Sequence, residues 1–509
     1  MQTLKPLKVA NALAAPASDL PEVRISELRE WLRNRVNGGA NLSALFACPV
    51  AEDLKRLRLV GVMSDPSRGS IELASAVVEE EYPALTPDCP AAHWFEREIA
   101  EQWGLRPLGH PWLKPIRFHR SYRPGFDAWD RSAEEPLLPC VTNFYRVEGD
   151  EVHEVAVGPV HAGVIEPGHF RFQCHGENVF HLEISLGYQH RGIERALRGG
   201  PTPRTQLLME TLAGDTTIGH GLAYVQLREA LGAAKVPARA HVLRGIALEL
   251  ERLANHVGDL GALANDVGFL PTASYCGRLR GDFLNLSAMI CGSRFGRNLL
   301  TPGGVRFDLD AERLKKFSDR FHEVVIDTEN AIQLLWDSSS VLARFEQTGT
   351  VPLGMARDLG LVGVAGRASG IEHDVRKDFP RGIFQFHQIP VSAWSTGDVF
   401  GRAYVRWLEI QRSEGFIKTM LRSLPATPIV GECQNPEPGR VVVSLTEGWR
   451  GAVCHAAMTD AEGRFLWYKV VDPSFHNWMG LAMALRGQQI SDFPLCNKSF
   501  NLSYCGHDL

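Results

Sequence analysis

Two histidines and a glutamate cluster in the loop Gly158–His169, whose sequence is GPVHAGVIEPGH. They are His161, Glu166 and His169, and two expected strands flank the loop. A loop that presents two imidazoles and a carboxylate could bind a quinone headgroup, relay protons or ligate a metal. The alternative is a tight Gly/Pro connection whose polar groups face solvent.

Two further short motifs carry histidines. In YQHRGIE, a helix would bring His190 and Glu194, four residues apart, onto one face. The alternative there is a surface ion pair. In SFHN, Ser474 could cap the apolar helix that follows, and His476 could be either a buried hydrogen-bonding residue or a catalytic one.

The segment GRASGIEHDVRKD is a dense run of polar and charged side chains. Solvated loop charges are the usual explanation for such a run, and a functional turn that faces a partner is the alternative. Its chemistry-bearing residues are Arg367, Ser369, Asp374, Arg376 and Asp378.

The chain has 10 cysteines, none of them in a CxxC pair. Scattered cysteines in a chain of this size indicate a reduced, cytoplasmic protein. Zinc, nickel and iron–sulfur sites commonly use a local two-cysteine clip, which is missing, so we expect no cofactor bound by this chain alone. No P-loop, HExxH or GxSxG occurs, and no GxGxxG follows a strand.

Periodicity places these motifs in an α+β fold with two domains. Residues 1–125 form a small α+β unit with expected strands Leu57–Met63 and Ser70–Val78 and an expected helix His93–Trp103. Residues 126–150 form a proline-containing linker, and 151–509 a mainly helical domain, a helix-bundle core with peripheral strands. Apolar spacing of three or four predicts helices over Ala238–Gly261, Arg313–Phe345 and Gly397–Leu424, and Arg440–Leu445 and Gly463–Val471 are expected strands.

Bulk composition argues against a nucleic-acid partner and against a membrane span in this chain. The net charge of -5 gives no reason to expect a nucleic-acid partner. No apolar run approaches the ~18 residues that a membrane-spanning helix needs, so a membrane role would require partner subunits.

Five motifs, in order along the chain, resemble one family. FEREIAEQWGLRPLGHP (Phe95–Pro111) is similar to the C-terminal signature of the complex I "C" subunit, of thirty-kilodalton type. GPVHAGVIEPGHFRF, LGYQHRGIER, GVAGRASGIEHDVRKDFP and PSFHN resemble the large subunit of complex I (the "D" subunit) and of formate hydrogenlyase-type group 4 nickel–iron hydrogenases. The EPGHFRF variant and the C–D fusion favour the hydrogenase branch. The resemblance covers about residues 50–509.

The sequence departs from the hydrogenase pattern at all four nickel-ligand cysteines. METLAGDTTIGHGLAY keeps His220 and Tyr224 of that pattern, and SFNLSYCGHDL matches its C-terminal motif. Cys505 lies one residue out of register, and the chain ends directly after the motif, so no clipped extension is expected. The residues at the four cysteine positions are Ala213, Thr216, Ser503 and Gly506.

The resemblance implies a peripheral subunit of a membrane-bound redox complex on the cytoplasmic side of the cell membrane. Its implied partners are a small subunit with a 4Fe–4S cluster, a ferredoxin-like subunit and antiporter-like membrane subunits. Nickel–iron is expected to be absent, and quinone or another small acceptor could bind in the vacated cavity, as in complex I. There the headgroup-facing tyrosine aligns with Gly214, and the histidine falls near Glu166–Pro167.

The candidate site residues of this cavity are His161, Glu166, His169, Glu194 and His220. A structural or energy-coupling subunit without chemistry of its own is the alternative function. A true hydrogenase is disfavoured by the missing ligands.

Overall fold

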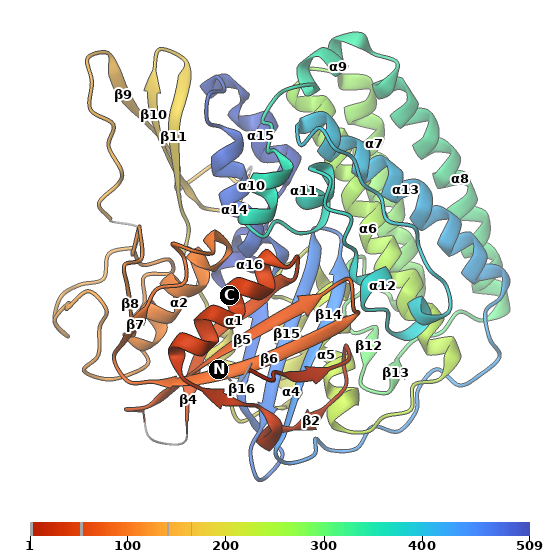
Figure 1. Cartoon of the computed structure of the whole chain (residues 1–509). Helices are drawn as coiled ribbons and strands as arrows, with labels where there is room; N and C mark the ends of the chain where they lie inside the picture. The colour runs from red at the N-terminus through yellow and green to blue at the C-terminus, as the bar shows by residue number, and fades with distance from the viewer. Residues whose placement is uncertain (1–3, 51–53, 140–141, 164) are drawn as a thin grey trace.

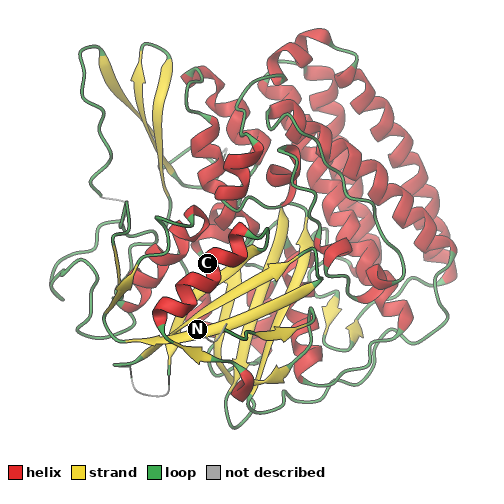
Figure 2. Cartoon of the chain, in the orientation of Figure 1, coloured by secondary structure: helices red, strands yellow, loops and turns green. Residues whose placement is uncertain are grey.

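The computed structural model describes residues 4–50, 54–139, 142–163 and 165–509. It is a mixed α+β fold, which confirms the class expected from the sequence (Figure 2). Long helices gather on one side of the molecule, and crossed sheets lie beside them (Figure 1). Within the described ranges, no helix is both long enough and apolar enough to cross a membrane.

The N-terminal part is built on a five-stranded sheet. Its order is β1 (Leu7–Val9), β6 (Ser70–Val78), β5 (Leu57–Asp65), β4 (Asn41–Pro49), and β3 (Glu22–Val23) adds to β6 in parallel. The three long strands are almost wholly buried, so they are rich in Val, Leu and Ala on both faces.

Two helices cover this sheet. In α1 (Ile25–Asn37), the buried residues are Leu28, Trp31 and Leu32. A Cβ at Gly61 of β5 would lie 2.8 Å from a Leu32 methyl. The absence of a side chain at Gly61 therefore lets α1 pack closely on the sheet. α2 is His93–Trp103, which confirms the predicted helix at both ends.

A long stretch without helix or strand joins the two parts. It runs from the end of β8 (Arg106–Leu108) to the start of β9 (Val152–Val157), within the described residues. β9, β10 (His169–His175) and β11 (Asn178–Ser185) form an antiparallel sheet that projects from the molecule (Figure 1).

Four long helices make the bundle: α6 (Ala238–Asp266), α7 (Leu270–Cys291), α8 (Ala311–Trp336) and α13 (Val399–Arg422). Each carries buried apolar residues every three or four positions, which confirms the periodicity argument. The predicted helix Arg313–Phe345 is instead two helices, because the chain turns at Asp337 and Ser338. Asp and Ser favour helix ends, since their side chains compete for backbone hydrogen bonds.

A second sheet lies inside the molecule. β14 (Arg440–Gly448), β15 (Gly451–Thr459) and β16 (Phe465–Val471) are antiparallel, and β2 (Ala15–Pro16) pairs with β14. Nearly every residue of the three long strands is buried. The expectation of peripheral strands is therefore wrong for this sheet, because its faces are covered by helices and by the N-terminal sheet.

The shorter elements connect these layers and supply most of the site. They are β7 (Glu81–Pro83), β12 (Leu300–Thr301), β13 (Gly304–Val305), α3 (Ile193–Leu197), α4 (Pro203–Met209), α5 (Thr217–Leu231), α9 (Ser339–Phe345), α10 (Leu353–Asp358), α11 (Gly363–Ala368), α12 (Val375–Asp378), α14 (Pro473–Ala484), α15 (Phe493–Phe500) and α16 (Tyr504–Asp508).

Candidate functional site

The C-terminal tail folds back into the large domain and is fixed there by a capped helix. The Ser503 hydroxyl accepts the backbone N–H of Gly506 at 2.9 Å and so caps α16. The Ser503 N–H in turn donates to the Ser474 hydroxyl at 2.8 Å. The sequence suggested Ser474 as the cap of α14, and this is wrong, because the neighbouring Asp472 carboxylate accepts the Ser474 N–H at 2.8 Å.

Asp472 lies against Gly506, one of the four positions that the resemblance aligns with nickel-ligand cysteines. A Cβ built on Gly506 would lie only 2.6 Å from Asp472 Cγ, closer than such atoms approach. The second carboxylate oxygen of Asp472 is 2.9 Å from His220 Nε2, and both side chains have no exposed surface. The carboxylate therefore occupies space into which a side chain at position 506 would extend.

His220 begins a buried chain of hydrogen bonds. Its Nδ1 is 3.0 Å from His455 Nε2, and His455 Nδ1 is 2.8 Å from the Tyr468 hydroxyl. Burial alone would raise the pKa of Asp472, but the hydrogen bond from His220 lowers it, so Asp472 is ionised. Burial lowers the pKa of His455 and raises that of Tyr468, so both of these groups are neutral.

These charge states make the chain continuous. Ionised Asp472 can only accept, so His220 Nε2 donates to it. Neutral His455 donates through one ring nitrogen and accepts through the other, so it links His220 to the Tyr468 hydroxyl. An unbroken hydrogen-bonded chain is the arrangement that a proton relay requires.

The other cysteine positions are also engaged with protein partners. Arg450 forms two 2.7 Å hydrogen bonds with Asp215 and lies 3.4 Å from the Thr216 hydroxyl, which itself donates to Asp215. Ala213 is fully buried and apolar. With Ser503 used as a cap, the residues at the four positions do not fit a nickel–iron centre, since none supplies a free soft ligand.

Among the described residues, Cys505 is a thiol that lies between two of these positions, Ser503 and Gly506. Its Sγ is 3.4 Å from the Ser503 hydroxyl, and Glu166 accepts the neighbouring Tyr504 N–H at 3.3 Å. Burial, followed by the nearby Glu166 carboxylate, raises the pKa of Cys505 to about 11. The group is therefore a neutral thiol at physiological pH, and the Gly214 N–H points at its sulfur.

The five residues predicted as one cavity lie in separate environments. Glu166 lies beside Cys505, and His220 lies beside Asp472, near the C-terminal tail. His161 donates to Gly168 O at 2.8 Å, and His169 contacts Gly158 O and Arg171. The hydrogen bonds of both histidines therefore stay local, within the loop 158–169 and strand β10.

Glu194 belongs to a different cluster. It lies 2.9 Å from Lys469, accepts the Val470 N–H, and does not share a helix face with His190. That expectation was wrong because α3 begins only at Ile193, after Gly192 with a left-handed φ of 66°. His190 instead bonds to the backbone carbonyl of Asp508.

Sequence reasoning missed three members of the relay. Asp472 directly follows β16. His455 lies on β15, and Tyr468 lies on β16. Strand alternation puts His455 on one face of β15 with Cys454 on the other, but β15 was not predicted. Asp472 comes directly before the PSFHN motif, and this position was the feature of the sequence that could have indicated it as a site residue.

The charged loop was also misjudged, because its arginines and Asp374 are buried. Arg367 forms ion pairs with Glu409 at 2.5 Å and Glu447 at 2.7 Å, and Arg376 pairs with Asp374 at 2.6 Å. These side chains are at most 3% exposed. The loop is therefore part of an interior ion-pair network that links α6, α13 and β14.

The fold has two parts, a small sheet domain and a larger part with a helix bundle and a buried sheet. The comparisons agree with both parts. Residues 20–128 match the family described as respiratory-chain NADH dehydrogenase, 30 Kd subunit, and residues 266–438 match the 49 Kd subunit of the same enzyme.

Relatives with curated names extend over most of the chain. It is 30% identical over 443 residues to formate hydrogenlyase subunit 5 of Escherichia coli, covering 83% of this chain and 76% of the relative. It is 30% identical over 378 residues to NADH-quinone oxidoreductase subunit 4 of Thermus thermophilus, covering 67% and 90%. The chain belongs to this family of fused complex I-type and group 4 hydrogenase-type subunits.

A solved structure shares the fold. It is described as the membrane-bound sulfane sulfur reductase, an archaeal respiratory membrane complex. The TM-score is 0.67 at 21% identity, and the match covers 72% of this chain and all of the other. This likeness concerns the fold alone.

Proposed function

We propose that the chain is a peripheral subunit of a membrane-associated, complex I-like or hydrogenase-related oxidoreductase. It passes electrons from an iron–sulfur cluster in a partner subunit to quinone or another small acceptor, without a nickel–iron centre. The acceptor binds beside the C-terminal tail. Partner membrane subunits of antiporter type and a ferredoxin-like subunit hold the complex at the cytoplasmic face.

The relay from Tyr468 to Asp472 is the observation that carries this proposal. Reduction of a quinone to a quinol consumes two electrons and two protons, so the site must supply protons as well as electrons. One shift along the relay moves the Tyr468 proton to His455, a His455 proton to His220 and a His220 proton to Asp472, which passes it to the reduced acceptor. Tyr468 is then reprotonated from its own end of the relay, and a second shift supplies the second proton. Burying four such groups is costly, and their continuous hydrogen bonding offsets that cost.

The absence of nickel is supported by the contacts at the four ligand positions. Asp472 fills the space beside Gly506, Ser503 caps α16, and Thr216 lies in the Asp215–Arg450 pair. The thiol of Cys505 is protonated at neutral pH, and a metal ligand must be a thiolate.

A second candidate function, a non-catalytic coupling subunit, is favoured by one specific contact. Lys469 of β16 pairs with Glu98 of α2 at 2.6 Å and with Glu194 at 2.9 Å, and all three are largely buried. This cluster ties the small domain to the large one, so a displacement of either would be transmitted to the other.

A test of the function uses the complex co-expressed with its partner subunits. Reduction of a soluble quinone by a reduced viologen is measured for wild type, His220→Gln and the exposed control His322→Gln. We expect the His220 variant to assemble and to lose at least about 10-fold in rate, because a general acid–base chain contributes 10²–10⁴-fold, while the control keeps its rate. Equal rates in an assembled His220 variant would favour the coupling role.

A further inference from the structure

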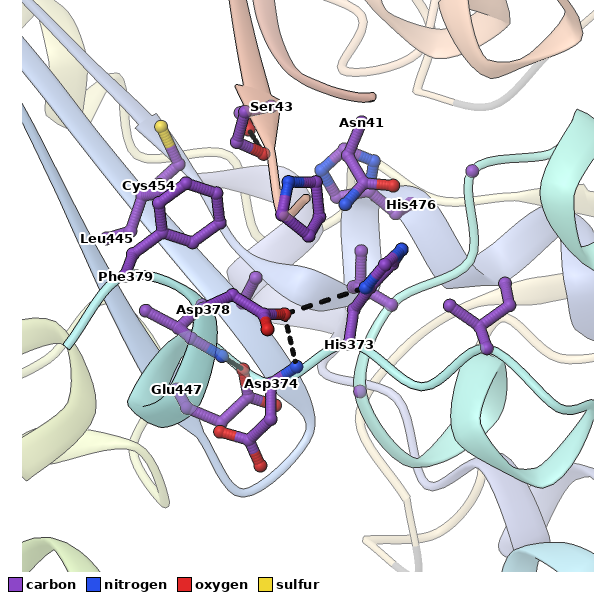
Figure 3. Close-up of a pocket in the computed structure, with 18 of the residues that line it drawn as sticks. Asn41, Ser43, His373, Asp374, Asp378, Phe379, Leu445, Glu447, Cys454 and His476 are labelled. Atoms are coloured by element: carbon purple, nitrogen blue, oxygen red, sulfur yellow. Dashed lines mark hydrogen bonds and ion pairs between the residues drawn. The ribbon is translucent and has the colours of Figure 1, made fainter. Parts of the chain in front are cut away.

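A pocket with both polar and apolar lining lies where the small domain meets the large one. About 630 Å³ of empty space, which includes open solvent, lies between its lining residues. Asn41 and Ser43 of β4 form one wall, and β14, β15, α12 and the loop before α12 form the others (Figure 3). Neither the relay nor the departed metal positions use this pocket.

One side of the pocket is apolar. Leu42, Val375, Phe379 and Leu445 line it, and Phe379 presents an aromatic ring beside Leu445 (Figure 3). An apolar wall with a few convergent polar groups is the usual composition of a small-molecule site.

Two polar side chains of the lining lack protein partners. His476 is only 8% exposed, yet neither of its ring nitrogens has a hydrogen-bond partner among the described residues. The Asn41 amide likewise has none within the described ranges, and Figure 3 shows it next to the His476 ring. Asn41 is half-buried and His476 is buried at the pocket wall, so both side chains are available to a ligand in the pocket.

Asp378 supplies a carboxylate with spare capacity. It accepts the Asp374 N–H at 3.1 Å and lies 3.5 Å from His373 Nδ1, beyond ordinary hydrogen-bond length (Figure 3). Its side chain is 10% exposed. A carboxylate accepts about four hydrogen bonds, so most of its capacity is open toward the pocket.

The wall behind Asp378 is a buried network of paired charges. Arg367 and Glu447 of this network line the pocket directly and form an ion pair at 2.7 Å. The network's arginines pair with Asp374, Glu249, Glu409 and Glu447, and Asp378 adds a further carboxylate to the pocket lining. A carboxylate in a partly enclosed pocket favours a cationic ligand.

We propose that this pocket binds a primary ammonium ion carried on a small apolar or aromatic body. The ammonium donates to Asp378, to the Asn41 side-chain oxygen and to a ring nitrogen of His476, and the body packs on Phe379 and Leu445. Three acceptors match the three N–H donors of an ammonium.

His476 suits this role because it is neutral. Burial lowers its pKa to about 4, so one of its ring nitrogens is an unprotonated acceptor at neutral pH. An imidazolium at the same place would repel the ligand. A cation over an aromatic ring is further stabilised by the ring quadrupole, which Phe379 can provide.

The test measures binding of three isosteric probes to the full chain by calorimetry: benzylamine, benzyl alcohol and benzoate. We expect benzylamine to bind with a Kd of about 1 mM, as its size allows, and the other two at least about 10-fold more weakly. Asp378→Asn keeps an acceptor for the Asp374 N–H and should weaken benzylamine binding about 10-fold. Asp282→Asn, a carboxylate on α7 that ion-pairs with Arg278, should leave it unchanged.

Asn41→Leu is a second variant. Asn41 begins β4, an outer strand of the sheet, so the substitution should disturb folding little. It should also weaken benzylamine binding. Equal binding of all three probes, no binding of benzylamine, or benzylamine binding that neither variant changes would overturn the proposal.

Discussion

The carboxylate of Asp472 packs directly on the backbone of Gly506, so that a Cβ at position 506 would lie 2.6 Å from Asp472 Cγ. Asp472 cannot move aside cheaply, because it caps α14 and accepts from His220. Position 506, where the resemblance to hydrogenases places a metal-binding thiol, thus packs against the hydrogen-bonded chain from Asp472 to Tyr468.

Gly506→Ala should destabilise the protein by about 1–3 kcal/mol, the usual cost of overpacking a filled interior. Urea unfolding measures this. Gly415→Ala is the matched control, because its Cβ would meet nothing within 4 Å in the interior of α13. The control should gain up to about 1 kcal/mol from helix propensity. Equal stability of the two variants would show that position 506 has room for a side chain.

Glu414→Gln should make stability less dependent on pH. Burial raises the pKa of Glu414 to about 8, and its Oε1 has no hydrogen-bond partner within the described residues. The folded state therefore holds a proton that the unfolded state releases near pH 4.5, so the contribution of Glu414 to stability falls as pH rises from about 4.5 to 8.

The unfolding free energy of Glu414→Gln should therefore rise relative to that of wild type as the pH increases from 5 to 8. The relative gain of the variant over this range should be at least about 1 kcal/mol. Denaturation at several pH values measures it, with the exposed pair residue Glu312→Gln as control. A difference that does not vary with pH would contradict the shifted pKa.

Lys469→Ala should cost about 3 kcal/mol, because it removes the cation from Glu194 and leaves buried Glu98 with Arg117 alone. Lys316→Ala removes an exposed ammonium paired with Glu312 and should cost under about 0.5 kcal/mol. Thermal unfolding compares the two. Similar losses in both would mean that the buried cluster does not hold the two domains together.

Limited proteolysis of the full chain should cut first within residues 126–150. The described residues there form no helix or strand, and many side chains are exposed, so their backbone can enter a protease. N-terminal sequencing of the first fragments locates the cut. First cleavage inside α6 would contradict the two-domain division predicted from the sequence.

Local patterns predicted much of the fold, and burial explains what they left out. The nine residues of β6 and the eleven of α2 were placed correctly, because their apolar spacing repeats over their full length. β15 was missed since small residues such as Ala452, Ala456 and Ala457 weaken the strand pattern. The charges of Arg367 and Arg376 suggested an exposed loop, because a sequence does not show the distant carboxylates that pair with them.

The site was harder to predict than the fold. His161 and His169 share a loop with Glu166, yet local hydrogen bonds hold both imidazoles near Gly158 and Gly168. The relay joins residues up to 252 positions apart, as His220 and Asp472 are. Only tertiary pairing brings such residues together, and spacing along one chain carries no trace of it.

Elemental analysis of nickel in the purified complex, expressed with a full nickel-maturation system, tests the central claim most directly. The claim is that Ala213, Thr216, Ser503 and Gly506 leave a site that works without nickel. We predict well under about one-tenth of a nickel per chain, because the site lacks the soft thiolate ligands that nickel sites use. About one nickel per chain would contradict the account.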